Sequence, residues 1–79
     1  MASVRVQLTF PADLVREPVI YHMAKTHHLV PNIRKVRVTE SAGEAILDLS
    51  GADEDVERGL ASLTARGVRV TRLSEPRGR

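Results

Sequence analysis

Three histidines are the residues of this 79-residue chain whose type most directly suggests metal chemistry. They are His22, His27 and His28, on a helix that we predict over about 17–28. A zinc-binding helix places two histidines four residues apart, so that both imidazoles lie on one face. The spacings here are five and six, and a histidine near a helix C-terminus is better explained by attraction to the helix dipole. We therefore predict no metal site.

No set of side chains suits covalent or acid–base catalysis. Cys is absent, which excludes a thiol nucleophile, thiolate zinc sites and iron–sulfur clusters. The adjacent carboxylates of Asp53, Glu54 and Asp55 are typical of the first turn of a helix, where negative charge meets the dipole favourably. No glycine-rich phosphate loop occurs, and no serine stands on a glycine-flanked elbow. We expect a protein that is not an enzyme and holds no cofactor.

One candidate ligand contact remains. Asn32 and Ile33 follow Pro31 at the entry to a predicted edge strand over 33–40. An asparagine in this place either makes a local hydrogen bond as a turn residue or presents its amide to a ligand at the margin of the sheet. The residues by themselves leave both interpretations open.

Alternation of apolar and polar residues predicts the strands that would position these residues. The predicted strands cover 4–10, 33–40, 45–50 and 68–73. Apolar residues at helical spacing predict the helix over 17–28, with Pro18 at its first position, and a second helix capped by Asp53. Gly67 suits the position just past the second helix, and Gly59 is expected to let that helix approach the sheet.

The strands over 33–40 and 45–50 form a predicted hairpin. We expect a tight turn on Ala42-Gly43, with Gly43 at positive φ. The expected cross-strand pairs are Val36 with Leu49, Val38 with Leu47 and Arg37 with Asp48. This register places the apolar pairs on one face and the ion pair on the other.

The order β-α-β-β-α-β predicts an α+β fold, the ferredoxin-like sandwich. Right-handed crossovers place both helices on one face of a four-stranded antiparallel sheet, whose edges are the strands over 33–40 and 68–73. We expect one domain over residues 1–79, with its folded part over about 4–73 and a polar tail over 74–79. The side chains expected beneath the helices are Val4, Val6, Leu8, Phe10, Val36, Val38, Leu47, Leu49, Val68 and Val70.

The opposite, open face of the sheet is predicted to be polar and basic. Its charged residues are expected to be Arg5, Lys35, Arg37 and Arg69 against Asp48, with Ile33 and Ile46 as isolated apolar side chains. By the same alternation Arg34 falls on the helix side of the sheet. We expect its aliphatic part to pack at the sheet margin while its guanidinium group reaches solvent. RNA-recognition modules of this fold stack bases on aromatic residues of the central strands. No aromatic residue falls there, so nucleic-acid binding is not expected.

Composition and charge also limit the class of protein to which the chain can belong. It has 12 Lys and Arg against 10 Asp and Glu, a net charge of +2. No apolar run approaches the roughly 20 residues that span a bilayer, and Met1-Ala2-Ser3 leads straight into a strand pattern, so we expect neither membrane insertion nor a signal peptide. The absence of Cys fits a reducing cytoplasm.

The sequence around Asn32 resembles the NIL domain family, which is named for an Asn-Ile-Leu tripeptide leading into its second strand. The tripeptide here is Asn32-Ile33-Arg34, with Arg34 in the place of the apolar third residue. The other matching segments are Leu8-Thr9-Phe10, Glu17-Pro18-Val19-Ile20, Leu49-Ser50-Gly51 and Leu63-Thr64-Ala65-Arg66-Gly67-Val68. Together they cover about residues 4–73.

The resemblance implies the same ferredoxin-like, ACT-like fold and a regulatory role. The family is known as a C-terminal domain of the ATPase subunit of methionine importers, where paired domains bind L-methionine near their interface. By this resemblance Asn32, Ile33 and Arg34 are the candidate ligand-binding residues of a homodimer. The alternative is a ligand-free module that docks to an enzyme of sulfur metabolism through the basic face (Arg5, Lys35, Arg37, Asp48 and Arg69) or the edge strand.

Overall fold

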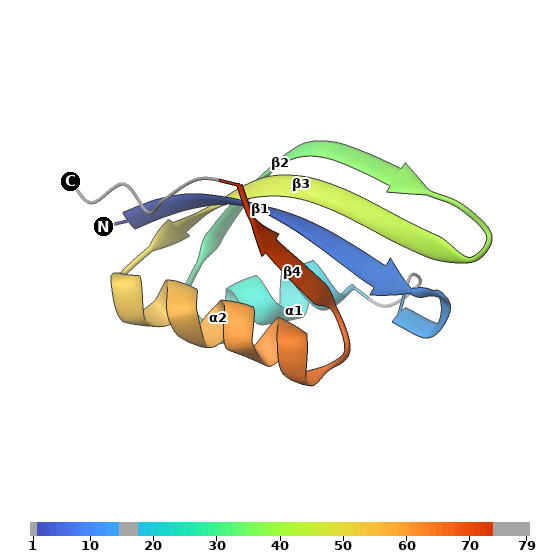
Figure 1. Cartoon of the computed structure of the whole chain (residues 1–79). Coiled ribbons are helices and arrows are strands. Elements are labelled where there is room, and N and C mark those ends of the chain that lie inside the picture. Colours follow the sequence, from blue (N-terminus) through green and yellow to red (C-terminus); the bar gives the residue numbers. More distant parts are fainter. Residues whose placement is uncertain (1, 15–17, 74–79) are drawn as a thin grey trace.

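The chain folds in the predicted order into a four-stranded sheet with two helices. The computed structural model describes residues 2–14 and 18–73. The elements are β1 (Ala2–Pro11), a single 3-10 turn η1 (Ala12–Leu14), α1 (Val19–Thr26), β2 (Val30–Val38), β3 (Ala42–Gly51), α2 (Asp53–Ala65) and β4 (Arg69–Arg72). The sheet is antiparallel in the order β2-β3-β1-β4, and both helices lie on one of its faces (Figure 1). The ferredoxin-like α+β prediction is confirmed, including the edge positions of β2 and β4; the predicted tail over 74–79 lies outside the described residues.

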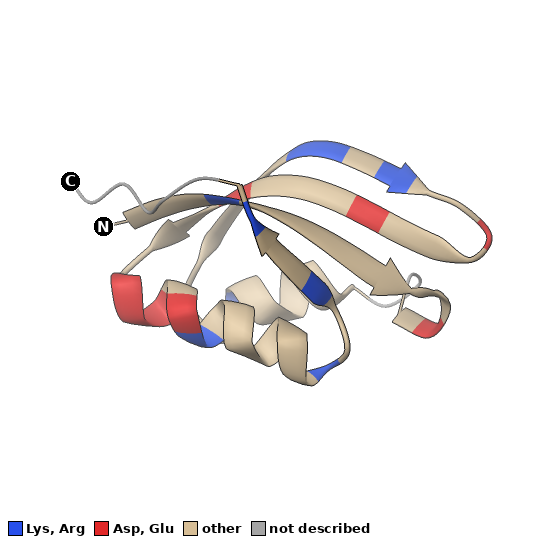
Figure 2. Ribbon diagram, in the orientation of Figure 1, with Lys and Arg blue, Asp and Glu red and all other residues tan. Residues whose placement is uncertain are grey.

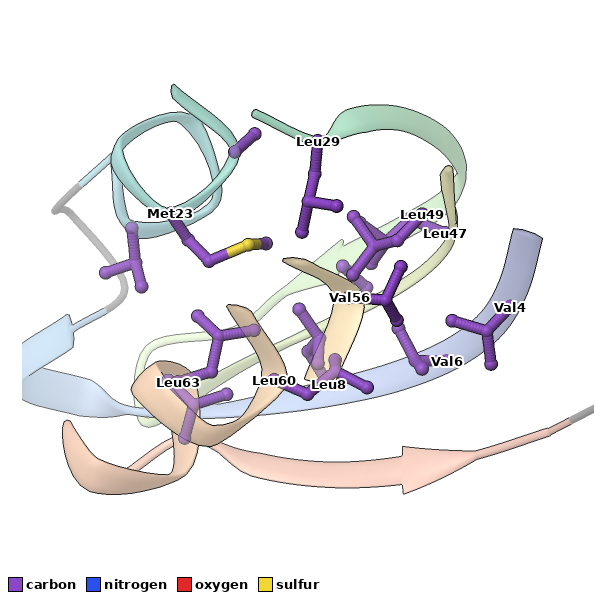
Figure 3. Close-up of a cluster of buried hydrophobic side chains, with 14 of the residues drawn as sticks. Val4, Val6, Leu8, Met23, Leu29, Leu47, Leu49, Val56, Leu60 and Leu63 are labelled. Atoms are coloured by element: carbon purple, nitrogen blue, oxygen red, sulfur yellow. The ribbon is translucent and has the colours of Figure 1, made fainter. Parts of the chain in front are cut away.

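The core lies between the helices and the two central strands. Alternate residues of β1 and β3 are buried beneath the helices, and the buried side chains of α1 and α2 close the layer from the other side (Figure 3). The buried strand residues are Val4, Val6, Leu8, Ala45, Leu47 and Leu49, and those of the helices are Val19, Met23, Ala24, Val56, Leu60 and Leu63. This pattern confirms the period-two interpretation of both central strands.

The ends of the helices differ from the predictions in detail. α1 is shorter than 17–28, because His28 adopts a φ of 57° and turns the chain so that Leu29 enters the core. Pro18 is the residue before α1 rather than its first residue. Likewise Ala52 occupies the N-cap of α2, and Asp53 begins the helix. Gly67 has the expected positive φ, 99°.

Gly59 permits a close approach, but to α1 and the segment after it rather than to the sheet. A Cβ atom at Gly59 would lie 2.7 Å from Cδ1 of Leu29 and 2.9 Å from Sδ of Met23. Both side chains are buried, and Met23 is therefore part of the core. The glycine lets the two helices share a single layer of side chains over the sheet.

The predicted register of the hairpin is wrong by four residues. The observed pairs are Val36 opposite Ala45, Arg37 opposite Glu44 and Val38 opposite Gly43. The turn consists of Glu40 and Ser41, and the Thr39 N–H donates to the Ala42 carbonyl oxygen at 2.8 Å. The Thr39 hydroxyl further closes the turn through contacts of 3.0 and 3.2 Å to the same residue.

Pairing with β1 explains this shift. β3 runs alongside β1 over its whole length, and this pairing reaches Phe10 opposite Gly43 and Pro11 opposite Ala42. Gly43 is therefore extended strand, without a positive φ, and the turn forms before Ala42. A local turn signal at Ala42-Gly43 is outweighed because it would remove the last rungs of a central ladder.

The same shift carries the hairpin beyond the helices. Val36 and Val38 lie on the helix side of the sheet, as predicted, yet they are 56% and 61% exposed. Figure 1 shows the hairpin tip reaching past the end of α1, which agrees with the exposure of these two side chains. Phe10 and Val70 also lie at the margin of the core and are only partly buried.

The observed register predicts the outcome of disulfide trapping in this cysteine-free chain. Arg37→Cys with Glu44→Cys should form an intramolecular disulfide on oxidation, because directly opposed residues lie within the Cα separation that a disulfide needs. Arg37→Cys with Asp48→Cys should not, since four residues along a strand separate the two by roughly 13 Å. Mass spectrometry of non-reduced peptides from dilute protein measures both. Efficient closure of the second pair alone would favour the register expected from sequence.

Candidate functional site

Asp48 is the centre of an ion cluster on the open face of the sheet. Its Oδ1 accepts a hydrogen bond from Nε of Arg5 at 2.8 Å, and its Oδ2 accepts one from Nη2 of Arg5 at 3.2 Å. Nε of Arg34 also donates a hydrogen bond to Oδ2 of Asp48 at 2.9 Å, and Nη2 of Arg34 lies 2.9 Å from the same oxygen. Two guanidinium groups share one carboxylate, so the cluster carries a net charge of +1.

The geometry of the cluster holds Asp48 ionised. The hydrogen bonds from Arg5 are the largest cause, and with a smaller contribution from Arg34 they lower the pKa of Asp48 to about 2, against an opposing effect of desolvation. The same partnership raises the pKa of Arg5 above its usual value. The side chain of Asp48 is only 15% exposed, whereas both arginines reach solvent. The cluster therefore presents positive charge outward and hides its negative charge.

A β-bulge in β2 brings Arg34 into this cluster. Ile33 lies opposite Leu47 and Lys35 opposite Ile46, which leaves Arg34 as the extra residue between two rungs. The expectation that Arg34 points inward is therefore wrong. Ile33, expected on the open face, lies opposite a core residue on the helix side and is 51% exposed at the edge. Because of this inserted residue, the residues of β2 before the bulge lie on the opposite face to the one that alternation predicts. Alternation counted back from residues 35–38 does not detect the insertion.

Asn32 lies directly opposite Asp48, one step from the bulge. Its side chain belongs to the open face by this pairing, and the residue is exposed. Asn32 and Arg34 thus both lie beside the Asp48 carboxylate, while Ile33 between them belongs to the other face. The three predicted ligand-binding residues therefore divide between the two faces of the edge strand, with Asn32 and Arg34 on the open face and Ile33 on the helix side.

The remaining residues of the predicted basic face are spread more widely. Lys35 lies opposite Ile46, and Arg37 lies opposite Glu44 rather than Asp48. Arg69 belongs to β4, the opposite edge strand of the sheet. β4 lies about 14 Å from β2, because three strand spacings separate them. Arg5, Arg34, Lys35 and Arg37 form one group with Asp48 and Glu44, and Arg69 stands apart from it.

Alternation could not reveal two further features of this face. Glu44 lies among the basic residues and accepts a 3.4 Å hydrogen bond from Nε2 of Gln7. Arg5, on β1, replaces Arg37 as a partner of Asp48 because these residues are opposed in the central ladder. Parity placed Arg5 and Asp48 on the same face, but only the register between distant strands shows that they touch.

An apolar groove lies on the helix side, beneath the projecting part of the hairpin. Its volume is about 180 Å³. It is bounded by Phe10, Leu14, Pro18, Val19, Ile20, Tyr21, Val36, Val38, Gly43, Glu44 and Ala45. The groove arises because β2 and β3 extend beyond α1, and it was not predicted from the sequence.

The two sites offer charged, amide and apolar groups to a ligand or a partner. Within residues 2–14 and 18–73 no three His, Asp or Glu side chains converge in a way that could hold a metal ion. In the same part of the chain no helix is both long and apolar enough to cross a membrane. Asn32, Arg34 and the neighbouring backbone offer amide and guanidinium groups to a ligand, and Ile33 offers an apolar surface.

Comparisons with known proteins agree with this architecture. The sequence profile of the NIL domain matches residues 4–72. The C-terminal domain of an ABC transporter ATP-binding protein from Enterococcus faecalis superposes with a TM-score of 0.77 at 17% identity, covering 91% of this chain and 84% of that chain. The de novo designed protein Foldit4 superposes with a TM-score of 0.58 at 13% identity, covering 94% and 97%. Both structures share the fold, and no curated protein matches the chain.

The ion cluster predicts a pH-dependent contribution to stability. Asp48→Asn should lower the free energy of unfolding at pH 7 by about 1 kcal/mol, after allowing for the exposure of both arginines. The carboxyl has a lowered pKa in the folded state, so its contribution is complete above pH 4 and is lost as the pH falls toward 2. Urea denaturation at pH 7, 4 and 2.5 measures the difference. Glu44→Gln, a more exposed carboxylate on the same strand and face, is the control and should show little change; equal effects of both substitutions at all pH values would contradict the assignment.

Proposed function

The chain belongs to the NIL domain family, and we propose that it is a small regulatory domain that senses L-methionine or a related sulfur amino acid in the cytoplasm. The observation that carries this proposal is the position of Asn32-Ile33-Arg34, exposed on an edge strand beside a positively charged cluster. The match to a C-terminal domain of an ABC transporter ATP-binding protein supports a regulatory role. The absence of any group of catalytic side chains in the sequence agrees with a function in binding.

Each part of an amino acid has a suitable neighbour at this site. The net positive charge of the Arg5–Asp48–Arg34 cluster attracts the ligand carboxylate, and Arg34 offers donors to it. The Asn32 amide both donates and accepts, so it orients the polar end of the ligand. Val30, which lies opposite Ser50 on the same face as Asn32 and is 64% exposed, supplies apolar surface for the ligand side chain, while Ile33 lies on the other face of the strand. Met23 contributes nothing to such a site because it is buried in the core.

We further propose that a second copy of the chain completes the site. One edge strand surrounds a small ligand on one side only, whereas high-affinity sites bury most of the ligand surface. The exposed apolar residues near the tripeptide are the type that a homodimer covers. Stability would then depend on protein concentration.

The alternative is a ligand-free module that docks to an enzyme of sulfur metabolism. The observation that favours it is the exposure of Val30, Ile33, Val36 and Val38, all on one edge strand, since such a strand can pair with a partner. Arg37→Glu should abolish the capture of a protein partner without unfolding the chain if this alternative holds. Sensing of an amino acid would be unaffected by the same substitution, so the two functions are separable.

Titration with L-methionine tests the sensing proposal directly. We expect saturable shifts in the ¹⁵N–¹H spectrum centred on residues 30–34, smaller with L-homocysteine and absent with L-leucine. Asn32→Ala should weaken binding at least tenfold, which corresponds to the roughly 1.4 kcal/mol expected for a hydrogen bond to a charged ligand group.

Arg37→Ala is the matched control, since it lies on the same exposed strand away from the tripeptide, and it should bind as the unaltered chain does. Sedimentation velocity with and without methionine reports the dimer. No shifts at millimolar methionine, or equal loss of binding in both variants, would remove the sensing proposal and leave the docking alternative.

A further inference from the structure

The backbone of the C-terminal half of β2 has unpaired groups on its outer side. Thr39 donates its N–H to Ala42, so this residue faces β3. Along an antiparallel pair, residues alternate between facing the neighbouring strand and facing away from it. Arg37 therefore faces β3, and the N–H and C=O groups of Val36 and Val38 point away from the sheet. β2 is an edge strand, so an added strand can bond to these groups.

The two faces of the same segment differ sharply in chemistry. On the helix side, Val36 and Val38 line the apolar groove together with Phe10 and Ile20. On the open face, Lys35 and Arg37 follow each other along the strand, as the basic stretch of β2 in Figure 2 shows. Lys35, Arg37 and Glu44 also bound a shallow polar hollow on this face.

We propose that the segment 35–38 binds an extended segment of a protein partner in which apolar and acidic residues alternate. The partner segment would add a strand to the sheet beside β2. Its backbone would pair with Val36 and Val38, and its apolar side chains would enter the groove, while its acidic side chains would lie across from Lys35 and Arg37. Backbone bonds supply affinity in this binding mode, and the alternate side chains supply specificity.

Charge disfavours a second copy of the chain as the occupant of this segment. An antiparallel pairing of two β2 strands sets Arg37 opposite the other Arg37 when Val36 pairs with Val38, and it sets Lys35 opposite Arg37 when Val36 pairs with Val36. Only the pairing of Val38 with Val38 avoids this, because it sets Arg37 opposite Thr39. Like charges directly opposite each other destabilise a sheet. The densest acidic stretch in the chain, Asp53–Asp55, begins the α2 helix (Figure 2) and does not form a strand.

This inference deepens the docking alternative by naming the chemistry of the partner, and it is independent of amino-acid sensing. The sensing site uses Asn32 and the bulged residue Arg34, whereas the docking segment begins after the bulge, at Lys35. Asn32→Ala should therefore leave docking unchanged. Loss of methionine binding with docking retained, or the reverse, separates the failure of one proposal from the failure of the other.

A synthetic peptide tests the proposal on the full chain. The probe has seven residues that alternate glutamate and valine, with blocked ends, and its control has lysine in place of glutamate. We expect saturable shifts of the amides of 35–38 with the acidic peptide and none with the basic one. Val36→Pro should weaken binding at least tenfold, because it removes an outward N–H that the ladder with β3 does not use.

Val36→Thr retains both the N–H and a β-branched side chain, so it should bind nearly as the unaltered chain does. Should Val36→Pro fail to fold, the double variant Lys35→Glu with Arg37→Glu keeps the test valid, because it should reverse the preference between the two peptides. Equal binding of both peptides, no shift with the acidic one, or undiminished binding by a folded Val36→Pro variant would overturn the proposal. Dilution-dependent shifts of 35–38 without peptide would overturn it as well, in favour of a second copy.

Discussion

The pairing of β1 with β3 is the constraint on which the rest of the structure depends. These strands lie side by side from Ala2 opposite Gly51 to Pro11 opposite Ala42. The inward side chains of Val4, Val6, Leu8, Leu47 and Leu49 are at most 1% exposed. A slip of one residue would turn that whole set toward solvent. The ladder therefore keeps its register, and it requires Gly43 to be extended. The hairpin turn must then form earlier, and the tip of the hairpin extends beyond the helices.

The consequences of this ladder reach the edge of the sheet. It places Arg5 opposite Asp48, and the bulge in β2 brings Arg34 to the same carboxylate. The bulge divides β2 into two halves with different chemistry. The half that contains Asn32 lies beside the ion cluster, and the half that contains Val36 and Val38 carries the groove and the outward backbone groups.

Both proposed functions use the residues that this small fold leaves uncovered. A domain of this size has one small core, and its edge strand β2 leaves four large apolar residues exposed. Lys35 and Arg37 discourage indiscriminate pairing along that edge, while they favour a partner of opposite charge. The fold itself is shared with the C-terminal domain of an ABC transporter ATP-binding protein and with a designed protein, so the two proposed functions are argued from these edge residues rather than from the architecture.

The sequence by itself determined the order of the elements, the central and edge strands, the faces of β1 and β3, and the resemblance at Asn32-Ile33-Arg34. Each of these depends on local periodicity or on short motifs, which contiguous residues carry. Only the tertiary structure decided the hairpin register, the partner of Asp48 and the faces of Ile33 and Arg34. A local turn at Gly43 competes with the pairing of β3 to β1, a strand that ends some thirty residues earlier in the chain. The bulge in β2 adds one residue that alternation does not reveal. These features arise from pairing between distant strands, where the burial of a whole face outweighs the preference of a single turn.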